Sequence, residues 1–290
     1  MEGKILVIGS TGTVGRLLVS ELVKAGALVR AATRDPATAA ARAGFSGGVE
    51  VVPFDLELVS TFDGALEGVD RVFLVARPGD EQSDRYAFPL IDAMERRGVC
   101  RVVDLSAMGA ELRPSFALRR IELRLEASRM AFTHLRPNWF MQVFTGGSLL
   151  ASIRAMHAIR VPAAAARISW IDARDVASVA AVALGPGRAH EAKAYTLTGG
   201  EALDHAEISS VIGGVSGMAV RYEPISDDEA RAALKAAGFP EQWVRRLITF
   251  YSLVREGYAA PISTAVQDIL GRSPRKFADF ARENAAVWRA

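Results

Sequence analysis

The sequence has 290 residues, of which 50% are hydrophobic and 23% are charged, a balance that indicates a globular protein and excludes a disordered or fibrous one. Its 35 basic and 33 acidic residues leave a net charge of +2, so we expect no nucleic-acid partner and no membrane-surface partner. A single cysteine and four scattered histidines exclude an intrachain disulfide and favour no metal site. With neither a signal peptide nor an apolar stretch of about 18 residues, the sequence predicts a soluble cytoplasmic protein.

Short apolar runs alternate with amphipathic segments over the first two-thirds of the chain, a pattern typical of βαβ units around a parallel sheet. The run at 71–75 is nearly all apolar, as in a strand that is buried on both faces. We therefore predict an α/β fold with a Rossmann-type doubly wound parallel sheet. The predicted strands cover 4–8, 28–32, 50–53, 71–75, 101–105, 132–135 and 194–197, and the predicted helices cover 16–25, 86–97, 116–128 and 175–184.

The pattern changes near Gly199. Helix-like segments begin near Asp204 and Asp227, an aromatic-rich stretch covers 243–258, and a last helix follows Ser273-Pro274. Neither a repeat nor a long linker separates this part from the rest. We expect an α/β core at 1–150, with 170–198 returning to its sheet, and a smaller, mainly C-terminal lobe at 199–290.

A glycine-rich segment, 9–15, lies directly between the first predicted strand and the first predicted helix. Glycines at such a junction make the tight turn, let the backbone approach a pyrophosphate, and let the helix pack closely on the strand. The start of the helix then offers free N–H groups to the anion. A purely structural turn is the alternative. The predicted dinucleotide-binding residues here are Gly9, Ser10, Thr11, Gly12, Thr13, Val14 and Gly15.

The residues after the second predicted strand favour NADP over NAD. An NAD site usually has an acidic residue at the end of this strand, whereas this chain has Thr33 and Arg34. An arginine can pair with a 2′-phosphate and stack on adenine, and a threonine can donate a hydrogen bond. Asp35 is expected to point away. The alternative for Arg34 is a solvated arginine in a turn.

Two further strand ends are expected to reach the cofactor. Asp55 and Leu56 follow the third predicted strand and suit an adenine contact, although a helix cap is an equal alternative for Asp55. Val75, Ala76 and Arg77 follow the fourth predicted strand, where their backbone is expected to flank the ribose, and Arg77 is also a candidate for contacting phosphate or substrate.

Read together, these motifs resemble the NmrA-like group of atypical short-chain dehydrogenases, which includes triphenylmethane-reductase-like, quinone-reductase-like and azoreductase-like enzymes. The resemblance covers nearly the whole chain and implies NADP(H) bound along the carboxyl edge of the sheet, with substrate held under a C-terminal lobe. It rests on the segments 9–15, 33–34, 105–107, 122–128, 132–140, 171–177 and 275–280.

The helix that follows the fifth predicted strand departs from ordinary short-chain dehydrogenases. Those enzymes use a Tyr-xxx-Lys pair there to pass a proton, but 116–128 contains neither residue. Leu118 stands where relatives of the resembled group carry lysine or histidine. Ketone or alcohol redox chemistry and sugar-nucleotide epimerisation are therefore disfavoured. Two classes remain: an NADPH reductase of electrophilic acceptors (quinones, iminium ions, azo compounds and triphenylmethane dyes), and a non-catalytic NADP(H)-binding redox sensor.

The predicted pocket follows the fifth and sixth strands. Ser106 is the candidate catalytic residue, with a plain turn residue as the alternative, and Met108 is expected near the nicotinamide. Of the residues after the sixth strand, Trp139 and Phe140 are expected to cover the substrate, or else to pack in the core. The segment Pro137, Asn138, Trp139 and Phe140 is also predicted to contact the cofactor.

Other residues carry weaker expectations. His134 is expected to be structural and Cys100 to be a small buried residue, while Tyr251 and Tyr258 are expected either to line the pocket or to pack the lobe. We expect a monomer or small homo-oligomer that acts on an aromatic or conjugated small molecule.

Overall fold

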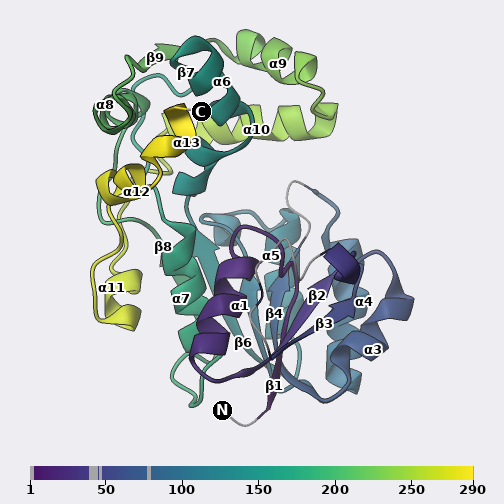
Figure 1. Ribbon diagram of the computed structural model, residues 1–290. Coiled ribbons are helices and arrows are strands. Elements are labelled where there is room, and N and C mark those ends of the chain that lie inside the picture. Colours follow the sequence, from purple (N-terminus) through teal and green to yellow (C-terminus); the bar gives the residue numbers. More distant parts are fainter. Residues whose placement is uncertain (1–2, 39–44, 46–47, 77–79, 290) are drawn as a thin grey trace. The chain divides into compact units, whose positions relative to one another are not determined.

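The chain folds into two compact units. Unit 1 comprises Met1–Pro137, Ala173–Leu197 and Asp268–Gly271, and unit 2 comprises Asn138–Asp172, Thr198–Gln267 and Arg272–Ala290. The structure is a computed structural model and describes residues 3–38, 45, 48–76 and 80–289 (Figure 1). The expected boundary near residue 150 therefore falls inside unit 2, because the chain leaves the sheet of unit 1 at Pro137.

Over the described residues, unit 1 is built on a seven-stranded sheet with the order β3-β2-β1-β4-β5-β6-β8. Every neighbouring pair is parallel, which confirms the predicted doubly wound sheet. The strand order reverses between β1 and β4, and ligands of such sheets bind at the carboxyl ends of the strands beside this reversal. The strands are β1 (Lys4–Val7), β2 (Leu28–Thr33), β3 (Val49–Pro53), β4 (Val69–Val75), β5 (Arg101–Leu105), β6 (Ala131–Pro137) and β8 (Lys193–Leu197).

Helices cover both faces of this sheet (Figure 1). Helices α1 (Gly15–Lys24) and α7 (Ala173–Ala183) pack against each other on one face. Helices α3 (Phe62–Leu66), α4 (Asp84–Arg96) and α5 (Ala117–Glu126) cover the other face. Each helix turns an apolar stripe towards the sheet, as expected from residues spaced four apart. Buried examples are Leu18 and Leu22 of α1, Leu90 and Met94 of α4, and Ile121 and Leu125 of α5.

One expectation for unit 1 is wrong. Cys100 is exposed rather than buried, and its Sγ lies 3.1 Å from the backbone oxygen of Asp70. Cys100 lies in the turn between α4 and β5, one residue before β5 begins, so its side chain does not enter the core.

Unit 2 combines helices with a two-stranded parallel sheet of β7 (Ala158–Val161) and β9 (Arg221–Pro224). Its core is aromatic, with Phe144, Trp170, Phe277 and Trp288 almost fully buried. Helices α8 and α9 start at capping boxes in which an acidic or serine side chain and a glutamate three residues later satisfy free backbone N–H groups. The helices of this unit are α6 (Gly147–Met156), α8 (His205–Ser216), α9 (Asp227–Ala236), α10 (Glu241–Arg255), α12 (Phe277–Glu283) and α13 (Ala285–Arg289), and the residues of α11 (Ala265–Leu270) are divided between the two units.

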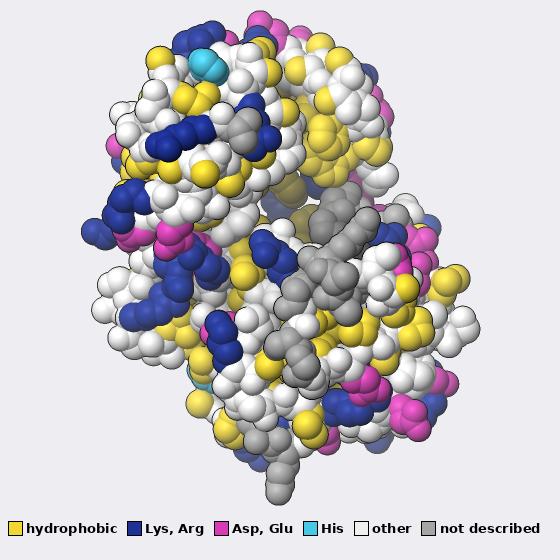
Figure 2. All heavy atoms as spheres, viewed as in Figure 1, with side chains coloured by type: hydrophobic (Ala, Val, Ile, Leu, Met, Phe, Trp, Pro, Cys, Tyr) yellow, Lys and Arg dark blue, Asp and Glu magenta, His cyan; other side chains and the backbone are white. Residues whose placement is uncertain are grey.

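The surface carries charges of both signs. Lys and Arg side chains are interspersed with Asp and Glu side chains on the face drawn in Figure 2, in keeping with the small net charge. Among the described residues, no helix combines the length and the apolar character needed to cross a membrane.

Candidate functional site

The segment between β1 and α1 can be made only with glycine at two positions. Gly9 has φ +68°, the left-handed region that side chains disfavour. A Cβ on Gly15 would lie 2.1 Å from the backbone oxygen of Gly9, far inside contact distance. The N–H of Gly12 donates to that same Gly9 oxygen at 2.9 Å and closes the turn. The glycines therefore allow α1 to begin directly against the end of β1.

The start of α1 presents unused hydrogen-bond donors. Val14 caps the helix without a side-chain hydrogen bond, and the first turn has no acidic residue. Among the described residues, the N–H groups of Thr11, Thr13 and Val14 have no hydrogen-bond acceptor. Thr11, Gly12 and Thr13 are exposed. Such a helix start attracts an anion through its free N–H groups and its dipole, so these residues fit a pyrophosphate.

The turn is fixed to its two neighbouring strands. The Ser10 hydroxyl, which is buried, donates to the backbone oxygen of Ala32 in β2 at 2.8 Å. The side chain of Val75, at the end of β4, lies 3.6 Å from the position that a Cβ on Gly9 would take. The turn, the end of β2 and the end of β4 thus form one carboxyl edge of unit 1, where the sequence predicted them. Ala76 is buried at this edge, and Arg77 lies outside the described residues.

The end of β2 leaves Arg34 exposed. Its neighbour Asp35 is occupied locally, since its carboxylate accepts hydrogen bonds from the backbone N–H of Thr38 at 3.3 Å and from the Thr38 hydroxyl at 2.5 Å. Among the described residues, Arg34 thus presents an exposed guanidinium at the end of β2, a group that can pair with a phosphate.

Asp55 makes local contacts but does not cap a helix, because Leu58 and Thr61 precede the short helix at Val59–Thr61 and α3, and neither helix has a side-chain cap hydrogen bond. Its carboxylate accepts the N–H of Glu57 at 3.0 Å, and its backbone N–H donates to the Thr61 hydroxyl at 3.1 Å, so it shapes the turn before α3. Leu56 is half-buried against the core of unit 1. An adenine contact by these two residues stays a prediction.

Ser106 and Met108 continue the carboxyl edge beyond β5. The N–H of Ser106 donates to the oxygen of Leu135 at 2.8 Å, and the N–H of Met108 donates to the oxygen of Pro137 at 3.0 Å. Both residues are thereby held beside β6. Ser106 is buried, and its hydroxyl makes no hydrogen bond of ordinary geometry to a described residue.

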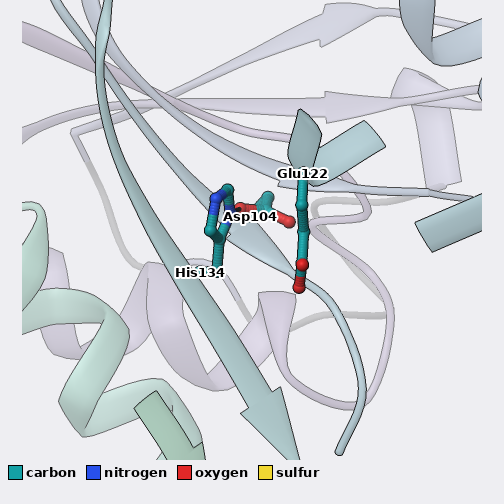
Figure 3. A group of neighbouring side chains, drawn as sticks. All are labelled: Asp104, Glu122 and His134. Atoms are coloured by element: carbon teal, nitrogen blue, oxygen red, sulfur yellow. Dashed lines mark hydrogen bonds and ion pairs between the residues drawn. The ribbon is translucent and has the colours of Figure 1, made fainter. Parts of the chain in front are cut away.

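A buried ionic group that the sequence analysis missed joins β5, β6 and α5 (Figure 3). Asp104 of β5 and His134 of β6 are partners in the strand register, and His134 Nδ1 makes a short hydrogen bond with the Asp104 carboxylate. His134 Nε2 lies 3.4 Å from the Glu126 carboxylate. Burial raises the pKa of Asp104, whereas contact with Asp104 outweighs burial at His134 and raises the imidazole pKa. The pair is therefore built to hold a proton between the two strands.

Glu122 of α5 completes this group and is fully buried. Arg136 of β6 binds both of its oxygens, at 2.9 and 2.8 Å, and Arg119 donates to it at 2.8 Å. Burial opposes ionisation, but the hydrogen bond from Arg136 and those from Ser106 and Arg119 together lower the pKa of Glu122. The Ser106 hydroxyl is thus close to this carboxylate, although their geometry is not that of a regular hydrogen bond.

Asp104, Glu122 and His134 have potential metal-ligand atoms within 4.8 Å of one another, a spacing that a metal ion could bridge. The donor set does not fit a dication, because two arginines already bind the Glu122 carboxylate and His134 is hydrogen-bonded to Asp104. We therefore interpret Asp104, Glu122 and His134 as a buried ion network.

In unit 2, the residues that follow β6 have structural contacts of their own. The Asn138 amide donates to the Ser169 hydroxyl at 2.7 Å and to the oxygen of Ala259 at 2.8 Å. Trp139 is half-buried and accepts the N–H of Ile171 through its backbone oxygen. Phe140 is also half-buried and bridges to Ile171. These contacts fix the segment, and a nicotinamide contact from it stays a prediction.

Trp139 belongs to an aromatic group within unit 2. Its ring centroid lies 5.0 Å from that of Tyr251 and 6.0 Å from that of Trp170, with an edge-on geometry towards Trp170. His205 packs edge-on against Trp170 and stacks on Tyr222. Trp139 was expected either to cover the substrate or to pack in the core, and its partial exposure agrees with both roles.

The chain is similar in sequence to known proteins along nearly its whole length. The chain matches the model of the NmrA-like family over residues 1–280. It is 35% identical to an NAD(P)H azoreductase of Xenophilus azovorans over 291 residues, which cover 99% of both chains.

Two solved structures are similar in fold. One is a triphenylmethane reductase of Citrobacter sp. complexed with NADP(H), with 24% identity, a TM-score of 0.84 and coverage of 97% of this chain and 99% of that one. The other is NmrA, a negative transcriptional regulator in complex with NADP, with 16% identity, a TM-score of 0.79 and coverage of 98% and 96%. At these identities the two structures support the fold alone. The family match and the azoreductase relative, in contrast, extend along nearly the full length. This chain belongs to the NmrA-like family.

Proposed function

We propose that this protein is an NADPH-dependent reductase that transfers hydride to an electrophilic, conjugated acceptor such as a quinone, an azo compound, a triphenylmethane dye or an iminium ion. The observation that carries the proposal is the glycine turn: a Cβ on Gly15 would overlap the Gly9 oxygen, and the N–H groups beside it have no acceptor among the described residues. A turn of this kind suits a pyrophosphate. The 35% identical relative that is named NAD(P)H azoreductase supports the same activity.

The residues proposed to hold NADP(H) lie at strand ends. The N–H groups of Thr11, Thr13 and Val14 donate hydrogen bonds to the pyrophosphate. Arg34 and Thr33 bind the 2′-phosphate, and the backbone at Val75 flanks the ribose. When bound, the cofactor supplies hydride from the nicotinamide ring. The full proposed set is Gly9, Ser10, Thr11, Gly12, Thr13, Val14, Gly15, Thr33, Arg34, Asp55, Leu56, Val75, Ala76, Arg77, Ser106, Pro137, Asn138, Trp139 and Phe140.

The substrate side of the proposal rests on aromatic and soft side chains. Met108, Trp139 and Phe140 are proposed to pack against a flat acceptor and to exclude water from the site. Ser106, held by the Leu135 oxygen and close to Glu122, is proposed to orient the nicotinamide amide or the acceptor. Helix α5 offers neither tyrosine nor lysine as a proton donor, so the electrophilicity of the acceptor is what drives hydride transfer.

Loss of NADPH fluorescence or absorbance in the presence of quinones, azo dyes and triphenylmethane dyes tests the proposal. We expect saturable oxidation of NADPH with at least one of these acceptor classes and slower oxidation of NADH. If NADPH binds tightly while every acceptor remains unreduced, the protein is instead a non-catalytic reader of the NADPH/NADP⁺ ratio. The fold similarity to the NADP-bound regulator NmrA is the observation that favours this second candidate function.

A further inference from the structure

Ser106 has a buried hydroxyl without a regular hydrogen-bond partner. The residue is only 5% exposed, and its Oγ makes no hydrogen bond of ordinary geometry to a described residue. Its backbone, in contrast, is fixed, because its N–H donates to the Leu135 oxygen of β6 at 2.8 Å. A buried hydroxyl normally has a partner, since leaving one unpaired costs free energy. The unused hydrogen-bonding capacity of Ser106 therefore points to a ligand.

The position of Ser106 within unit 1 suits the nicotinamide end of the cofactor. The residue directly follows β5, and a single strand, β4, separates β5 from β1 in the sheet. Neighbouring strands lie about 4.8 Å apart, so the end of β5 is roughly 10 Å along the carboxyl edge from the glycine turn after β1. A ribose and a pyridine ring span a comparable length. The ligand group that Ser106 meets is therefore the nicotinamide with its carboxamide.

The neighbouring carboxylate of Glu122 is ionised. It is fully buried, Arg136 binds both of its oxygens at 2.9 and 2.8 Å, and Arg119 donates to it at 2.8 Å. Burial opposes ionisation, but the hydrogen bonds that the carboxylate accepts, with that from Arg136 the largest, outweigh burial and lower the pKa of Glu122. An ionised carboxylate accepts hydrogen bonds and has no hydrogen to donate.

This carboxylate determines which way the Ser106 hydroxyl turns. A serine hydroxyl has one hydrogen and two lone pairs, and next to a carboxylate its hydrogen turns towards the negative charge. Only the lone pairs then remain for a ligand, so Ser106 is a hydrogen-bond acceptor on its ligand side. Of the two polar ends of a carboxamide, the N–H₂ group matches an acceptor and the C=O group does not.

We propose that Glu122 positions the Ser106 hydroxyl to accept a hydrogen bond from the N–H₂ group of the nicotinamide carboxamide. This inference rests on the proposed function, which assigns NADP(H) to the carboxyl edge of unit 1. Glu122 acts through Ser106 and is a positioning residue. The contact fixes the rotation of the carboxamide and, with it, the orientation in which the ring is held for hydride transfer. The two residues thereby make the site specific for the amide form of the cofactor.

Equilibrium binding of two oxidised nucleotides tests this polarity without turnover. The 3-acetylpyridine analogue of NADP⁺ has a methyl group in place of the N–H₂ group and keeps the carbonyl. We expect the full-length wild type to bind the analogue about 10-fold more weakly than NADP⁺, because the buried Ser106 oxygen is left without a donor. In Ser106→Ala that acceptor is absent, so the preference is expected to disappear. Ser128→Ala is the matched control, since it deletes a hydroxyl that donates to the Leu125 oxygen at 2.7 Å, and we expect it to keep the wild-type preference.

Glu122→Gln separates positioning from a purely structural role. A glutamine amide can donate to Ser106, which frees the serine hydrogen to turn towards the ligand, so the preference for NADP⁺ over the analogue is expected to be lost. A residue that only stabilises the fold would, when replaced, weaken both nucleotides equally and leave the preference unchanged, and that result would overturn the inference. Thermal unfolding establishes whether the variant is folded.

The wild type and Ser106→Ala decide the inference even where Glu122→Gln does not fold. A serine that Glu122 does not orient would donate to the carbonyl that both nucleotides carry. Equal binding of the two nucleotides by wild type, or the same preference in wild type and Ser106→Ala, would therefore overturn the inference. If wild type shows the preference but reduces no acceptor, the proposed reductase activity fails and the inference stands. If wild type binds neither nucleotide, both fail.

Discussion

At the scale of single residues, the glycine turn gives the sharpest prediction. We expect Gly15→Ala to abolish measurable NADPH binding and to destabilise unit 1, because its Cβ would lie 2.1 Å from the Gly9 oxygen and α1 must then move away from β1. Calorimetric titration with NADPH and urea denaturation measure the two effects. The matched control is Gly64→Ala in α3, where an added Cβ meets no atom within 4 Å, and we expect it to keep wild-type affinity. Equal affinity for the two variants would contradict the turn as the pyrophosphate site.

Arg34 tests the cofactor preference. Removing its guanidinium deletes a charge-assisted contact that only the 2′-phosphate of NADPH can use. Arg34→Ala is therefore expected to weaken NADPH binding by about 10- to 100-fold and NADH binding by much less. Arg188→Ala, which removes an arginine whose side chain is 87% exposed, serves as the control. Equal losses of affinity for NADPH and NADH would show that Arg34 does not bind the 2′-phosphate.

His205 makes the stability of unit 2 depend on pH. The imidazole is fully buried among aromatic rings, neither ring nitrogen has a partner among the described residues, and burial lowers its pKa from 6.5 to about 4. The unfolded chain binds a proton at a higher pH than the folded chain does. Stability is therefore unaffected by His205 above pH 6.5 and falls as the pH drops from 6.5 towards 4, by about 3 kcal/mol in total.

Urea denaturation between pH 4 and pH 8 measures this loss. His205→Phe, an aromatic replacement of similar shape, is expected to flatten the pH dependence over that window. A variant whose stability declines as steeply as that of wild type would assign the effect to other groups.

The buried ion network shows why some residues escape prediction. His134 alternates with apolar neighbours in its strand, so the sequence predicted a structural histidine, and its burial agrees with that. Its partner Asp104 is thirty residues away in the chain and meets it only through the register of β5 and β6. A sequence pattern contains no information on that register. The Arg136–Glu122 contact also joins two elements, β6 and α5, at a separation of 14 residues.

At the scale of elements, the strands of unit 1 were the most predictable part of the fold. The strands β1, β3, β4 and β5 are rich in β-branched and apolar residues, and the run at 101–105 agrees with β5 at both ends. The strands β7 and β9 were missed. They have four residues each, and Ala158 of β7 pairs with Arg221 of β9, 63 positions later in the chain. Over the described residues their sheet has no third strand, so neither shows a pattern of its own. Helix α6 was missed as well, because its glycine start and mixed composition have no capping signal.

The attachment of α5 to the sheet depends on Glu122. Glu122→Gln removes the charge that two arginines share in the interior, and leaving buried charges without their partner costs about 3–5 kcal/mol. Denaturant titration measures the change in the free energy of unfolding. Glu95→Gln is the control, because its ion pair with Arg124 is partly solvated, and such pairs contribute less than about 1 kcal/mol. Similar losses in the two variants would mean that the Glu122 network stabilises no more than a surface pair does.

At the scale of the whole molecule, the two units were predicted unevenly. Sequence order suggested a lobe that begins near 199, yet unit 2 also takes 138–172, whose segments pair with the C-terminal third through Asn138, Trp170 and Phe144. Such long-range pairing is set by packing rather than by local pattern. The glycine turn was predictable because its glycines lie within seven consecutive residues between β1 and α1. The aromatic group around Trp139 was only partly predictable because its members come from distant segments.

The proposed reductase activity requires a pyridine nucleotide to bind at the start of α1. Calorimetric titration of the purified full-length chain with NADPH and, separately, with NADH measures this without reference to any acceptor. We predict saturable binding with one site per chain and a clear preference for NADPH. Absence of heat and of saturation with both nucleotides, in a sample shown to be folded, would contradict the account.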